Sequence, residues 1–538
     1  DKVVARLKEL RENDLLGPST SSVVEEAKRR GIPALRLNNV SLVQLGYGSK
    51  QRRIQATMTD RTSALGVEIA DEKFRTKELL LRAGIPVPKG AIAWSLEEAT
   101  RVAEDIGYPV VVKPEVGHHG KGITARISDA QGLAAAFVSA QKYCDPVIVE
   151  KNLSGFDFRV LVINGKLVAA ALREPAYVIG DGVSSIRHLI DKVNSDPRRG
   201  VGHERVLTAI TVDDMTERLI SFRGYRIDDV LPAKEKLYLK STANLSTGGT
   251  ARDVTDDVHQ DVWLMCERIA RLVGMDCIGI DIVAPSLDQP LPPDSAGIVE
   301  VNAAPGFRMH LDPSEGKSRN VAKPFVEMLF PADVSFQVPI VAVTGTNGKT
   351  TTSRMLAHIL KMSGRTVGLT STDGVYIDGK LSVAGDMTGP VSAKMILRDP
   401  SVDAAVMESA RGGMLRSGLG FPECDVAACL NVSADHLGLR GIDTVEQLAE
   451  VKRIPIEIAK GAAVLNADDP LCLQMADHTD AETICYVTMN PSHPLVKQHI
   501  QAGGQAFVLE LGMNGHMITI YDGESHTPLL WTHLIPAT

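Results

Sequence analysis

The sequence predicts a multidomain α/β protein, and three observations indicate this. Segments with the patterns of strands and helices alternate through roughly the first 330 residues. The stretch "LFPADVSFQVP" (329–339) carries a proline near each end and reads as a linker. After it, apolar strands alternate with helices, which is typical of a parallel sheet. A chain of 538 residues also favours three or four domains.

Composition and charge indicate a globular protein and exclude some partners. The net charge is −8 and 44% of the residues are hydrophobic. This charge gives no reason to expect nucleic acid or an acidic membrane as a partner. No apolar run approaches the ~20 residues that span a bilayer. The seven cysteines form no C-x-x-C pair, so we expect reduced, buried cysteines in a cytoplasmic protein.

The chain divides into four predicted segments. Residues 1–60 read as a lead-in from an N-terminal domain that we expect to precede them. A first α/β domain is expected at 61–330, a linker at 331–339, and a second domain at 340–538. The second domain is expected, from the family resemblance that its motifs carry, to lack a C-terminal lobe. The sequence is therefore interpreted as a fragment or a shortened variant of a longer protein.

Within the first domain, helix and strand signals follow one another closely. The stretch 71–90 reads as a helix stopped by Gly84. A second helix is capped by Ser95, a turn follows at Gly107, and a strand ends in Lys113. Further along, 146–175 reads as one strand, a turn and two paired strands.

A glycine-rich loop with cationic side chains follows Lys113 in "PVVVKPEVGHHGKGI" (109–123). Glycines let the backbone close over phosphates, and cations neutralise them. Such loops are common, so this signal is weak when taken alone. The candidate nucleotide-binding residues here are Lys113, His118, His119, Gly120, Lys121 and Gly122.

Isolated acids interrupt two later apolar strands of the first domain. Asp281 lies in "IGIDIVAP", and Glu300 and Asn302 lie in "GIVEVNAAPGF". Glu300 and Asn302 are two residues apart, so in a strand they share one face. Oxygen ligands from neighbouring strands suit Mg²⁺ that is bound through phosphates. Each acid alone could equally be a surface residue on a half-exposed strand.

These residues, in this order and spacing, resemble the ATP-grasp family over roughly residues 60–325. The resemblance implies two α+β subdomains that hold ATP and activate a carboxylate as an acyl phosphate. It implies that Lys113 contacts phosphate and that Glu150 and Lys151 line the adenine pocket. It also implies that Arg308 meets the acyl phosphate or the acceptor. The implied Mg²⁺ ligands are Asp281, Glu300 and Asn302.

The second domain opens with a phosphate-loop pattern, "GTNGKTT". An apolar strand (338–343) enters it and a helical stretch (351–362) leaves it. The spacing is shorter than that of the general Walker loop, but strand, loop and helix N-terminus make an anion site. Lys349 is expected to reach phosphates and Thr350 to bind Mg²⁺. The alternative is an ordinary turn that happens to contain lysine. The nucleotide-binding candidates are Gly345, Thr346, Asn347, Gly348, Lys349, Thr350 and Thr351.

Polar residues recur at the ends of later strands in the second domain. Glu408, His436 and Asn466 each follow or close an apolar run, and the ends of parallel strands share one edge with the phosphate loop. The motifs GTNGKTT, E-x-A-R-G-G, N-x-x-x-D-H-L and N-A-D-D-P closely resemble the Mur ligase and folylpolyglutamate synthetase superfamily.

This second resemblance implies Mg²⁺ ligands at Thr350, Glu408 and His436, and an adenine contact at Asn466. Lys349 and His436, with Arg308 of the first domain, are the candidate catalytic residues. Lys452 matches a lysine that some members carbamylate; the alternative is an ordinary exposed helical lysine.

An ATP-grasp ligase fused to a Mur-type ligase resembles the cyanophycin synthetase family. The strings at 41–70 and 407–421 carry the same resemblance. It implies an ATP- and Mg²⁺-dependent ligase, expected to be a homo-oligomer, that uses L-aspartate, L-arginine and a cyanophycin primer. The first half would extend the poly-aspartate backbone and the second would attach arginine to side-chain carboxylates. Two alternatives stay open: a relative that joins β-Asp-Arg dipeptides with the first site only, and a non-catalytic nucleotide- or polymer-binding fragment.

Overall fold

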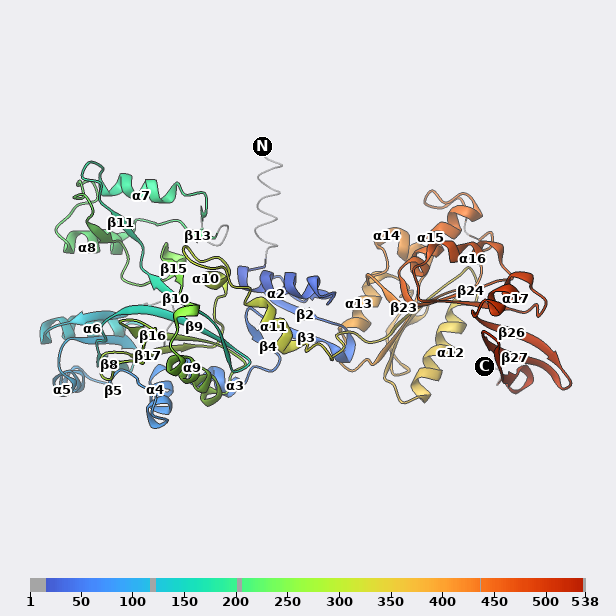
Figure 1. Cartoon of the computed structure of the whole chain (residues 1–538), viewed down its shortest axis with the longest axis horizontal. Helices are drawn as coiled ribbons and strands as arrows, with labels where there is room; N and C mark the ends of the chain where they lie inside the picture. Colours follow the sequence, from blue (N-terminus) through green and yellow to red (C-terminus); the bar gives the residue numbers. More distant parts are fainter. Residues whose placement is uncertain (1–15, 117–121, 201–205, 436, 536–538) are drawn as a thin grey trace. The chain divides into compact units, whose positions relative to one another are not determined.

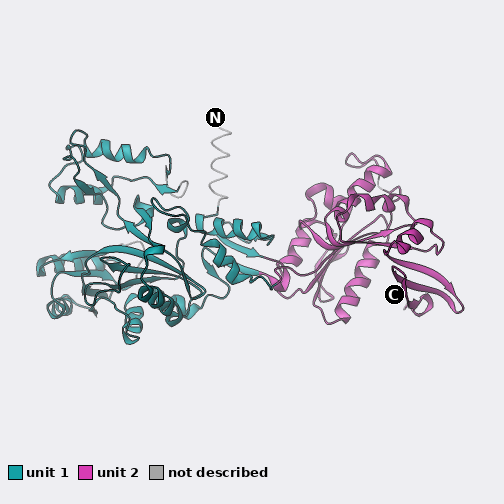
Figure 2. Cartoon of the chain, viewed as in Figure 1, with its two compact units in different colours: residues 1–45, 52–334 teal, residues 46–51, 335–538 magenta. Residues whose placement is uncertain are grey.

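A computed structural model of the chain divides it into two compact units (Figures 1 and 2). Unit 1 comprises residues 1–45 and 52–334, and unit 2 comprises residues 46–51 and 335–538. The residues that the structure describes are 16–116, 122–200, 206–435 and 437–535. Within these ranges, no helix combines the length and apolar character needed to cross a lipid bilayer.

Unit 1 begins with a helix and a small antiparallel sheet. Helix α2 (Pro18–Arg29) packs against α11 (Ala322–Leu329) from the end of the unit. The sheet has the order β1-β2-β3-β4. Its strands are β1 (Ala34–Arg36), β2 (Leu42–Leu45), β3 (Arg52–Gln55) and β4 (Met58–Thr59). Helices α3 (Ala64–Asp71) and α4 (Lys73–Arg82) follow.

A second antiparallel sheet of four strands, in the order β5-β8-β6-β7, carries two helices. Its strands are β5 (Gly90–Ala93), β6 (Val110–Pro114), β7 (Thr124–Ile127) and β8 (Val147–Lys151). Helix α5 (Leu96–Ile106) begins after Ser95, whose hydroxyl accepts the Glu98 N–H, so the predicted cap is confirmed. Helix α6 (Ala130–Gln141) packs with α5 over an alanine- and valine-rich core.

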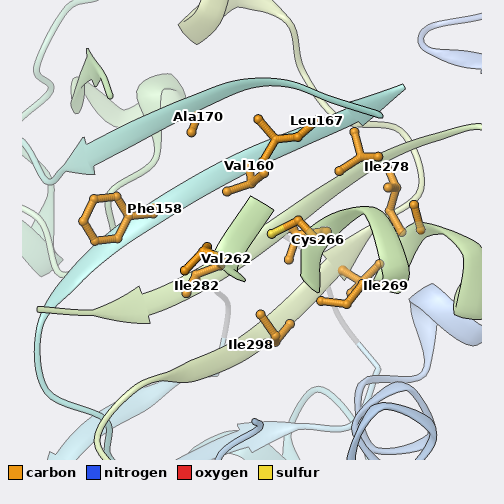
Figure 3. Packing of buried hydrophobic residues seen from close by; sticks show 14 of the residues in the cluster. Phe158, Val160, Leu167, Ala170, Val262, Cys266, Ile269, Ile278, Ile282 and Ile298 are labelled. Carbon is orange, nitrogen blue, oxygen red and sulfur yellow. The ribbon is translucent and has the colours of Figure 1, made fainter. Parts of the chain in front are cut away.

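The central sheet of unit 1 has five antiparallel strands in the order β15-β10-β9-β16-β17. They are β9 (Phe156–Ile163), β10 (Lys166–Glu174), β15 (Thr250–Asp253), β16 (Cys277–Ala284) and β17 (Gly297–Asn302). Helix α9 (Gln260–Val273) covers one face, where Cys266 and Ile269 pack on side chains such as Val160 and Ile282 (Figure 3). Because side chains alternate along strands, Arg159, Asp281 and Glu300 lie on the other face.

A smaller subdomain is inserted between β10 and β15 and has its own apolar core, which includes Val178, Ile186 and Leu237. Its described residues form two short two-stranded sheets and two helices. These elements are β11 (Tyr177–Ile179), α7 (Ile186–Asn194), β12 (Arg199–Gly200), β13 (Leu207–Thr208), α8 (Asp214–Phe222) and β14 (Lys236–Tyr238).

Unit 2 is built on one sheet in the order β21-β20-β19-β22-β18-β23-β24-β25-β26-β27-β28. The seven central strands are parallel, as predicted: β18 (Ile340–Thr344), β19 (Val367–Ser371), β22 (Ala404–Glu408), β23 (Cys424–Cys429), β24 (Ala459–Asn466), β25 (Thr483–Thr488) and β26 (Gln505–Gly512). Antiparallel hairpins close both edges: β20 (Gly374–Ile377) and β21 (Lys380–Ala384), and β27 (Gly515–Asp522) and β28 (Ser525–Trp531).

The principal helices of unit 2 connect these parallel strands. They are α12 (Lys349–Met362), α13 (Pro390–Arg398), α14 (Arg411–Ser417), α15 (Val445–Glu457), α16 (Pro470–Gln474) and α17 (Pro494–Gln501). The phosphate-loop helix begins two residues earlier than predicted, because Lys349 and Thr350 already form its first turn.

An early segment of the chain, residues 46–51, is part of unit 2. The Tyr47 N–H donates to the Phe336 carbonyl at 2.9 Å, and the Ser49 hydroxyl donates to Asp403 at 2.8 Å. Gly48 has a φ of +56°, and a Cβ there would lie 2.5 Å from the Val402 carbonyl oxygen. Only glycine fits this close approach without strain.

Candidate functional site

Two buried lysines share one carboxylate in unit 1. Lys113 on β6 places Nζ 2.6 Å from Oε1 of Glu150 on the neighbouring strand β8. Lys77 on α4 donates to the other oxygen of Glu150. All three side chains are buried. One carboxylate cannot fully neutralise two ammonium groups, so this cluster carries a net positive charge whenever both lysines are protonated, which suits a phosphate-binding site.

The pKa values of the two lysines respond differently to this shared partner. Burial lowers the pKa of Lys77 to about 7, although Glu150 opposes the shift. Burial also disfavours the charge on Lys113, but Glu150 outweighs it and raises the pKa of Lys113. Lys113 therefore holds the proton, and a bound polyphosphate would favour protonation of Lys77 as well.

Helix α4 contributes functional candidates that the sequence interpretation missed. Lys73 and Lys77 lie one turn apart and are both buried, which is rare for lysine. Burial lowers the pKa of Lys73, and Glu300 on β17 is the strongest opposing influence. The sequence signal for these residues was that two lysines, four residues apart, lie on the same face of the helix as the buried Leu80.

The face of the central sheet opposite α9 carries a row of mostly charged side chains. The strand register aligns one residue from each strand: Asp253, Ala171, Arg159, Asp281 and Glu300. Cross-strand neighbours lie about 4.5–5.5 Å apart at Cβ, so these residues interact directly. Two of the three predicted metal ligands, Asp281 and Glu300, are thus neighbours.

Asp281 is engaged by two arginines. Arg159 forms a two-pronged contact, with one bond from Nη2 at 3.0 Å, and Arg173 Nη2 lies 3.0 Å from the same carboxylate. Despite burial, these guanidinium groups lower the pKa of Asp281. Arg173 also pairs with Asp157. Asp281 is therefore anionic and oriented, and its role as a metal ligand remains a prediction.

Glu300 and Asn302 are half-buried on the same face of β17, as their spacing predicts. The buried amide nitrogen of Asn302 has no hydrogen-bond partner among the described residues. A carboxylate and an amide oxygen side by side are suitable ligands for Mg²⁺. No group of three or more His, Cys, Asp or Glu side chains in the described ranges could hold a metal by itself. Phosphate oxygens would have to complete the coordination.

Arg308 and His310 belong to the short helix α10 (Arg308–Leu311), which follows β17. The Arg308 guanidinium is buried and donates to the Val206 carbonyl and, at 3.3 Å, to the Thr208 hydroxyl. It therefore links α10 to the inserted subdomain, and its predicted contact with the acyl phosphate or acceptor remains untested. Both ring nitrogens of the buried His310 lack a partner among the described residues.

The remaining unit 1 candidates are placed only in part. Lys151 donates from Nζ to the carbonyls of Gly107 and Tyr108, at 2.9 and 3.2 Å. Gly122 has a φ of +72°, which favours glycine. The loop candidates His118, His119, Gly120 and Lys121 lie outside the described residues, as does His436 of unit 2.

The predicted phosphate loop of unit 2 leads from β18 directly into α12. The Asn431 side chain accepts the N–H groups of Thr346 at 3.1 Å and Asn347 at 2.9 Å, which fixes the loop. Helix α12 begins after Gly348 without a side-chain cap. Lys349, in its first turn, bonds to the Thr346 carbonyl at 2.9 Å. An uncapped helix N-terminus beside a lysine is suited to phosphate.

Thr350 and Glu408 meet beside this loop. The Thr350 hydroxyl lies 3.0 Å from Oε2 of Glu408 and 3.1 Å from the Thr372 hydroxyl. Burial raises the pKa of Glu408, although the bond from Thr350 opposes the shift. A hydroxyl and a carboxylate at the mouth of a phosphate loop are the oxygen pair expected for Mg²⁺.

Lys452 is not the exposed helical lysine that was one alternative. It is buried on α15, and Nζ donates to the Gly345 carbonyl at 2.7 Å. Burial and the nearby Lys349 lower the pKa of Lys452 to about 8. An amine with this pKa is neutral in about a tenth of the molecules at pH 7, far more than an ordinary lysine. Its carbamylation remains a prediction.

Asn466 closes β24 at the same edge of the sheet. Its side chain donates to the Leu430 carbonyl at 2.8 Å and accepts the Asp468 N–H at 3.0 Å. Asp468 in turn binds Thr488, the last residue of β25. The ends of β18, β22, β23 and β24 thus converge on one edge, where a ligand of a parallel sheet is expected.

Comparison with protein families supports both halves. Residues 70–177 match the RimK-like ATP-grasp domain, and residues 343–520 match the Mur ligase middle domain. The matches fall in unit 1 and unit 2 respectively. Together with the mixed α/β architecture, they confirm the predicted fold class and the order of the two domain types.

Curated relatives match the whole chain. The cyanophycin synthetase of Synechocystis sp. is 49% identical over 100% of this chain and 62% of its own length. The cyanophycin synthetase of Geminocystis herdmanii is 49% identical over 99% of this chain and 61% of its own length. The chain therefore spans about three fifths of the length of these relatives.

Among solved structures, a bifunctional glutathione synthetase from Pasteurella multocida covers 59% of this chain and 44% of its own. It matches with 30% identity and a TM-score of 0.47. The sequence similarity to these relatives extends over this whole chain, and the two domain matches lie within it, one after the other. The chain is therefore a homologue of the cyanophycin synthetases that combines a RimK-like ATP-grasp domain with a Mur ligase middle domain.

Proposed function

We propose that this chain contains two ATP-dependent ligase sites that together build cyanophycin from L-aspartate and L-arginine. Unit 1 would extend the poly-aspartate backbone at its carboxyl end, and unit 2 would join arginine to the side-chain carboxylate. Amide formation from a carboxylate in water needs an activated intermediate, and an acyl phosphate formed from ATP provides one. Two different carboxylates need two differently shaped sites, which is consistent with one site in each unit.

In unit 1, Lys113 and Lys77 would bind the phosphates of ATP, because they are cations that share only Glu150. Glu300 and Asn302 would hold Mg²⁺ together with phosphate oxygens. Asp281 would orient Arg159 and Arg173, whose guanidinium groups are suited to anionic carboxylate or phosphate. A bound Mg²⁺ would neutralise charge on the phosphoryl group during transfer.

In unit 2, the first turn of α12 and Lys349 would bind the phosphates. Thr350 and Glu408 would hold the metal, with His436 as a further proposed ligand. Asn431 and Lys452 keep the loop in place through its backbone, at distances of 2.7–3.1 Å. A fixed loop lowers the reorganisation needed when the phosphoryl group moves.

The single observation that carries the proposal is the separate convergence of cations and oxygen ligands in each unit, with Lys113 inside the RimK-like match and Lys349 and Glu408 inside the Mur ligase middle domain match. We place the protein in the cytoplasm, where ATP is available and buried thiols stay reduced; six of its seven cysteines are buried. We expect a homo-oligomer and no nucleic-acid or membrane partner.

The experiment is to supply ATP, Mg²⁺ and a short cyanophycin primer, and to measure ADP release with aspartate alone, with arginine alone, with both, and with β-Asp-Arg dipeptide instead. We expect alternating dependence: aspartate is consumed once, and arginine is then required before the next aspartate. If only β-Asp-Arg dipeptides are joined, the dipeptide-joining alternative is correct. The absence of ADP release with any substrate would support a binding fragment and contradict the proposal.

A further inference from the structure

A five-residue loop, 303–307, connects the proposed metal ligand Asn302 to Arg308 at the start of α10. The loop folds back over the central sheet. A Cβ added to Gly279 of β16 would lie only 2.8 Å from Cβ of Pro305, so Pro305 rests directly on that strand. The position of this loop sets where β17 ends and where α10 begins. Whatever holds the loop therefore influences both ends of the proposed site.

One contact comes from the hairpin between β3 and β4. Thr57 lies in its two-residue turn, where Ala56 has a φ of +55°. The Thr57 side chain is 1% exposed, and its hydroxyl donates to the Pro305 carbonyl at 2.9 Å. A carbonyl that is buried without a partner is costly, so this bond favours one loop position over others.

A second contact comes from α2. The Ser19 hydroxyl, in the first turn of this helix, accepts the Phe307 N–H at 2.9 Å. The fully buried Phe307 ring packs edge-on against Phe325, with 5.6 Å between ring centroids. The loop is therefore held at its middle by one hydroxyl and at its end by another. Both hydroxyls come from the chain before residue 60.

The β3–β4 hairpin is itself fixed to the central sheet. The Thr62 hydroxyl donates to Oδ1 of Asp276 at 2.8 Å, and the Thr59 hydroxyl donates to Oδ2 at 2.5 Å. Asp276 immediately precedes β16. The hairpin thus joins the start of β16 to the loop that leaves β17. These two strands carry Asp281 and Glu300. The hairpin is therefore bonded to the residue before the strand of one acid and to the loop after the strand of the other.

We propose that Thr57 and Ser19 are positioning residues for the unit 1 site, and that they act on Asn302 and Arg308 through the 303–307 loop. This inference rests on the proposed function of unit 1. Removal of hydrogen bonds made directly to metal ligands typically changes metal affinity or activity about 10–100-fold, and we expect the lower end of this range for bonds that act through a loop. A loop with two buried anchor bonds holds its end residues more closely than loop packing alone would.

The first test compares Thr57→Val, which keeps the side-chain shape but removes the hydroxyl, with Thr57→Ser, which keeps the hydroxyl. For Thr57→Val we expect about a tenfold rise in the Mg²⁺ concentration that half-saturates aspartate-dependent ADP release, together with a lower kcat. Thr57→Ser should restore both values to near those of the unchanged protein. The matched control is Thr100→Val on α5, which removes a hydroxyl bond of 2.8 Å to the Leu96 carbonyl far from the loop in sequence.

Two results would overturn the proposal: an unchanged Mg²⁺ requirement in Thr57→Val, or equal impairment in Thr57→Ser and Thr57→Val. Circular dichroism and thermal melting identify a variant that fails to fold. If Thr57→Val fails to fold, the same Mg²⁺ titration is carried out on Ser19→Ala, and its result tests the proposal.

Hydrogen exchange adds a readout that does not depend on activity. In Ser19→Ala, the Phe307 amide loses its acceptor and should exchange at least about tenfold faster, while amides in α9 remain protected. Unchanged exchange at Phe307 would show that Ser19 does not hold the loop. If the unchanged protein shows no aspartate-dependent ADP release, the proposed function fails, but the exchange result still decides whether the anchor exists.

Discussion

Asp281 and Glu300 stand directly opposite each other on the antiparallel strands β16 and β17. Two adjacent carboxylates repel each other unless a cation lies nearby. Arg159 and Arg173 neutralise Asp281, and the buried Lys73 is the cation that Glu300 influences. The two arginines therefore neutralise Asp281, whereas Glu300 remains available to a metal ion.

Replacing Glu300 with Gln should abolish the aspartate-dependent reaction and leave the arginine-dependent one intact. The amide keeps the shape of the side chain but removes the anionic oxygen, and loss of a metal ligand at a phosphoryl-transfer site costs several kcal/mol, or more than about 100-fold in rate. ADP release with each amino acid separately measures this. Glu97→Gln, an exposed carboxylate on α5, is the matched control. Normal aspartate incorporation in Glu300→Gln would refute the assignment.

Replacing Lys349 with Ala should stop arginine incorporation, while a single aspartate addition to a primer made beforehand should continue. The reason is that Lys349 serves only the phosphate loop of unit 2, whereas unit 1 has its own lysines. Mass spectrometry of the primer after one round detects each addition. Lys361→Ala, at the far end of the same helix, controls for effects on α12. Loss of both additions in a folded Lys349→Ala protein would contradict two independent sites.

Replacing Glu408 with Gln should stabilise unit 2 at pH 7 without substrates, yet abolish its Mg²⁺-dependent nucleotide binding. Burial raises the pKa of Glu408, so the folded state binds this proton more tightly than the unfolded state does. The contribution of the group to stability is therefore largest at low pH. It declines as pH rises from the ordinary value of 4.5 through the higher folded value.

The measurement is urea unfolding at pH 4 and at pH 7, with hydrogen exchange of unit 2 peptides as the readout. The variant should gain stability only at pH 7, because at pH 4 the glutamate is already neutral. A gain of equal size at both pH values would mean that the cause is packing rather than charge. Retained Mg²⁺-dependent ATP binding would exclude Glu408 as a metal ligand.

Replacing His310 with Leu should make unit 1 less sensitive to mild acid. Burial lowers the pKa of His310 to about 3, and Arg159 and Arg173 add to this effect, while Asp253 opposes it. Below the ordinary pKa of 6.5, the unfolded chain takes up a proton that the folded state rejects. Stability is therefore lost as pH falls, by about 2 kcal/mol between pH 6.5 and pH 5.

Unfolding free energies of unit 1 at these two pH values, measured for the unchanged protein and for His310→Leu, test this. The acid-induced loss should be smaller by the stated amount in His310→Leu. Identical pH slopes in the unchanged protein and in His310→Leu would show that His310 titrates normally.

Much of the fold could be predicted because its signals are local. The Ser95 cap, the turn at Gly107 and the strand that ends near Lys113 depend on neighbours a few residues away. The same is true of the phosphate loop, which needs only a strand, two glycines and a helix N-terminus. Glu300 and Asn302 share a face because strand geometry alternates with a period of two.

The partners of the candidate residues could not be predicted, because they come from distant parts of the chain. Lys77 reaches Glu150 from 73 residues away, and Lys452 reaches Gly345 from 107 residues away. Lysine in a helix is usually exposed, so the burial of Lys452 had no local signal, and the spacing of Lys73 and Lys77 on one helix face did not identify their partners. Asp281 was identified as a candidate, but its two arginine partners depend on the register of β9, β10 and β16.

The sequence by itself determined the two domain types, their order and many of the side chains that carry the proposed chemistry, because periodicity and motif spacing are local properties of the chain. Only the tertiary structure decided which charges neutralise one another and which remain available to a ligand. It also assigned residues 46–51 to unit 2 and joined Thr57 and Ser19 to the 303–307 loop. Coulomb interactions and desolvation act through space, so the pKa of Lys77 or Glu408 depends on neighbours that only folding brings together.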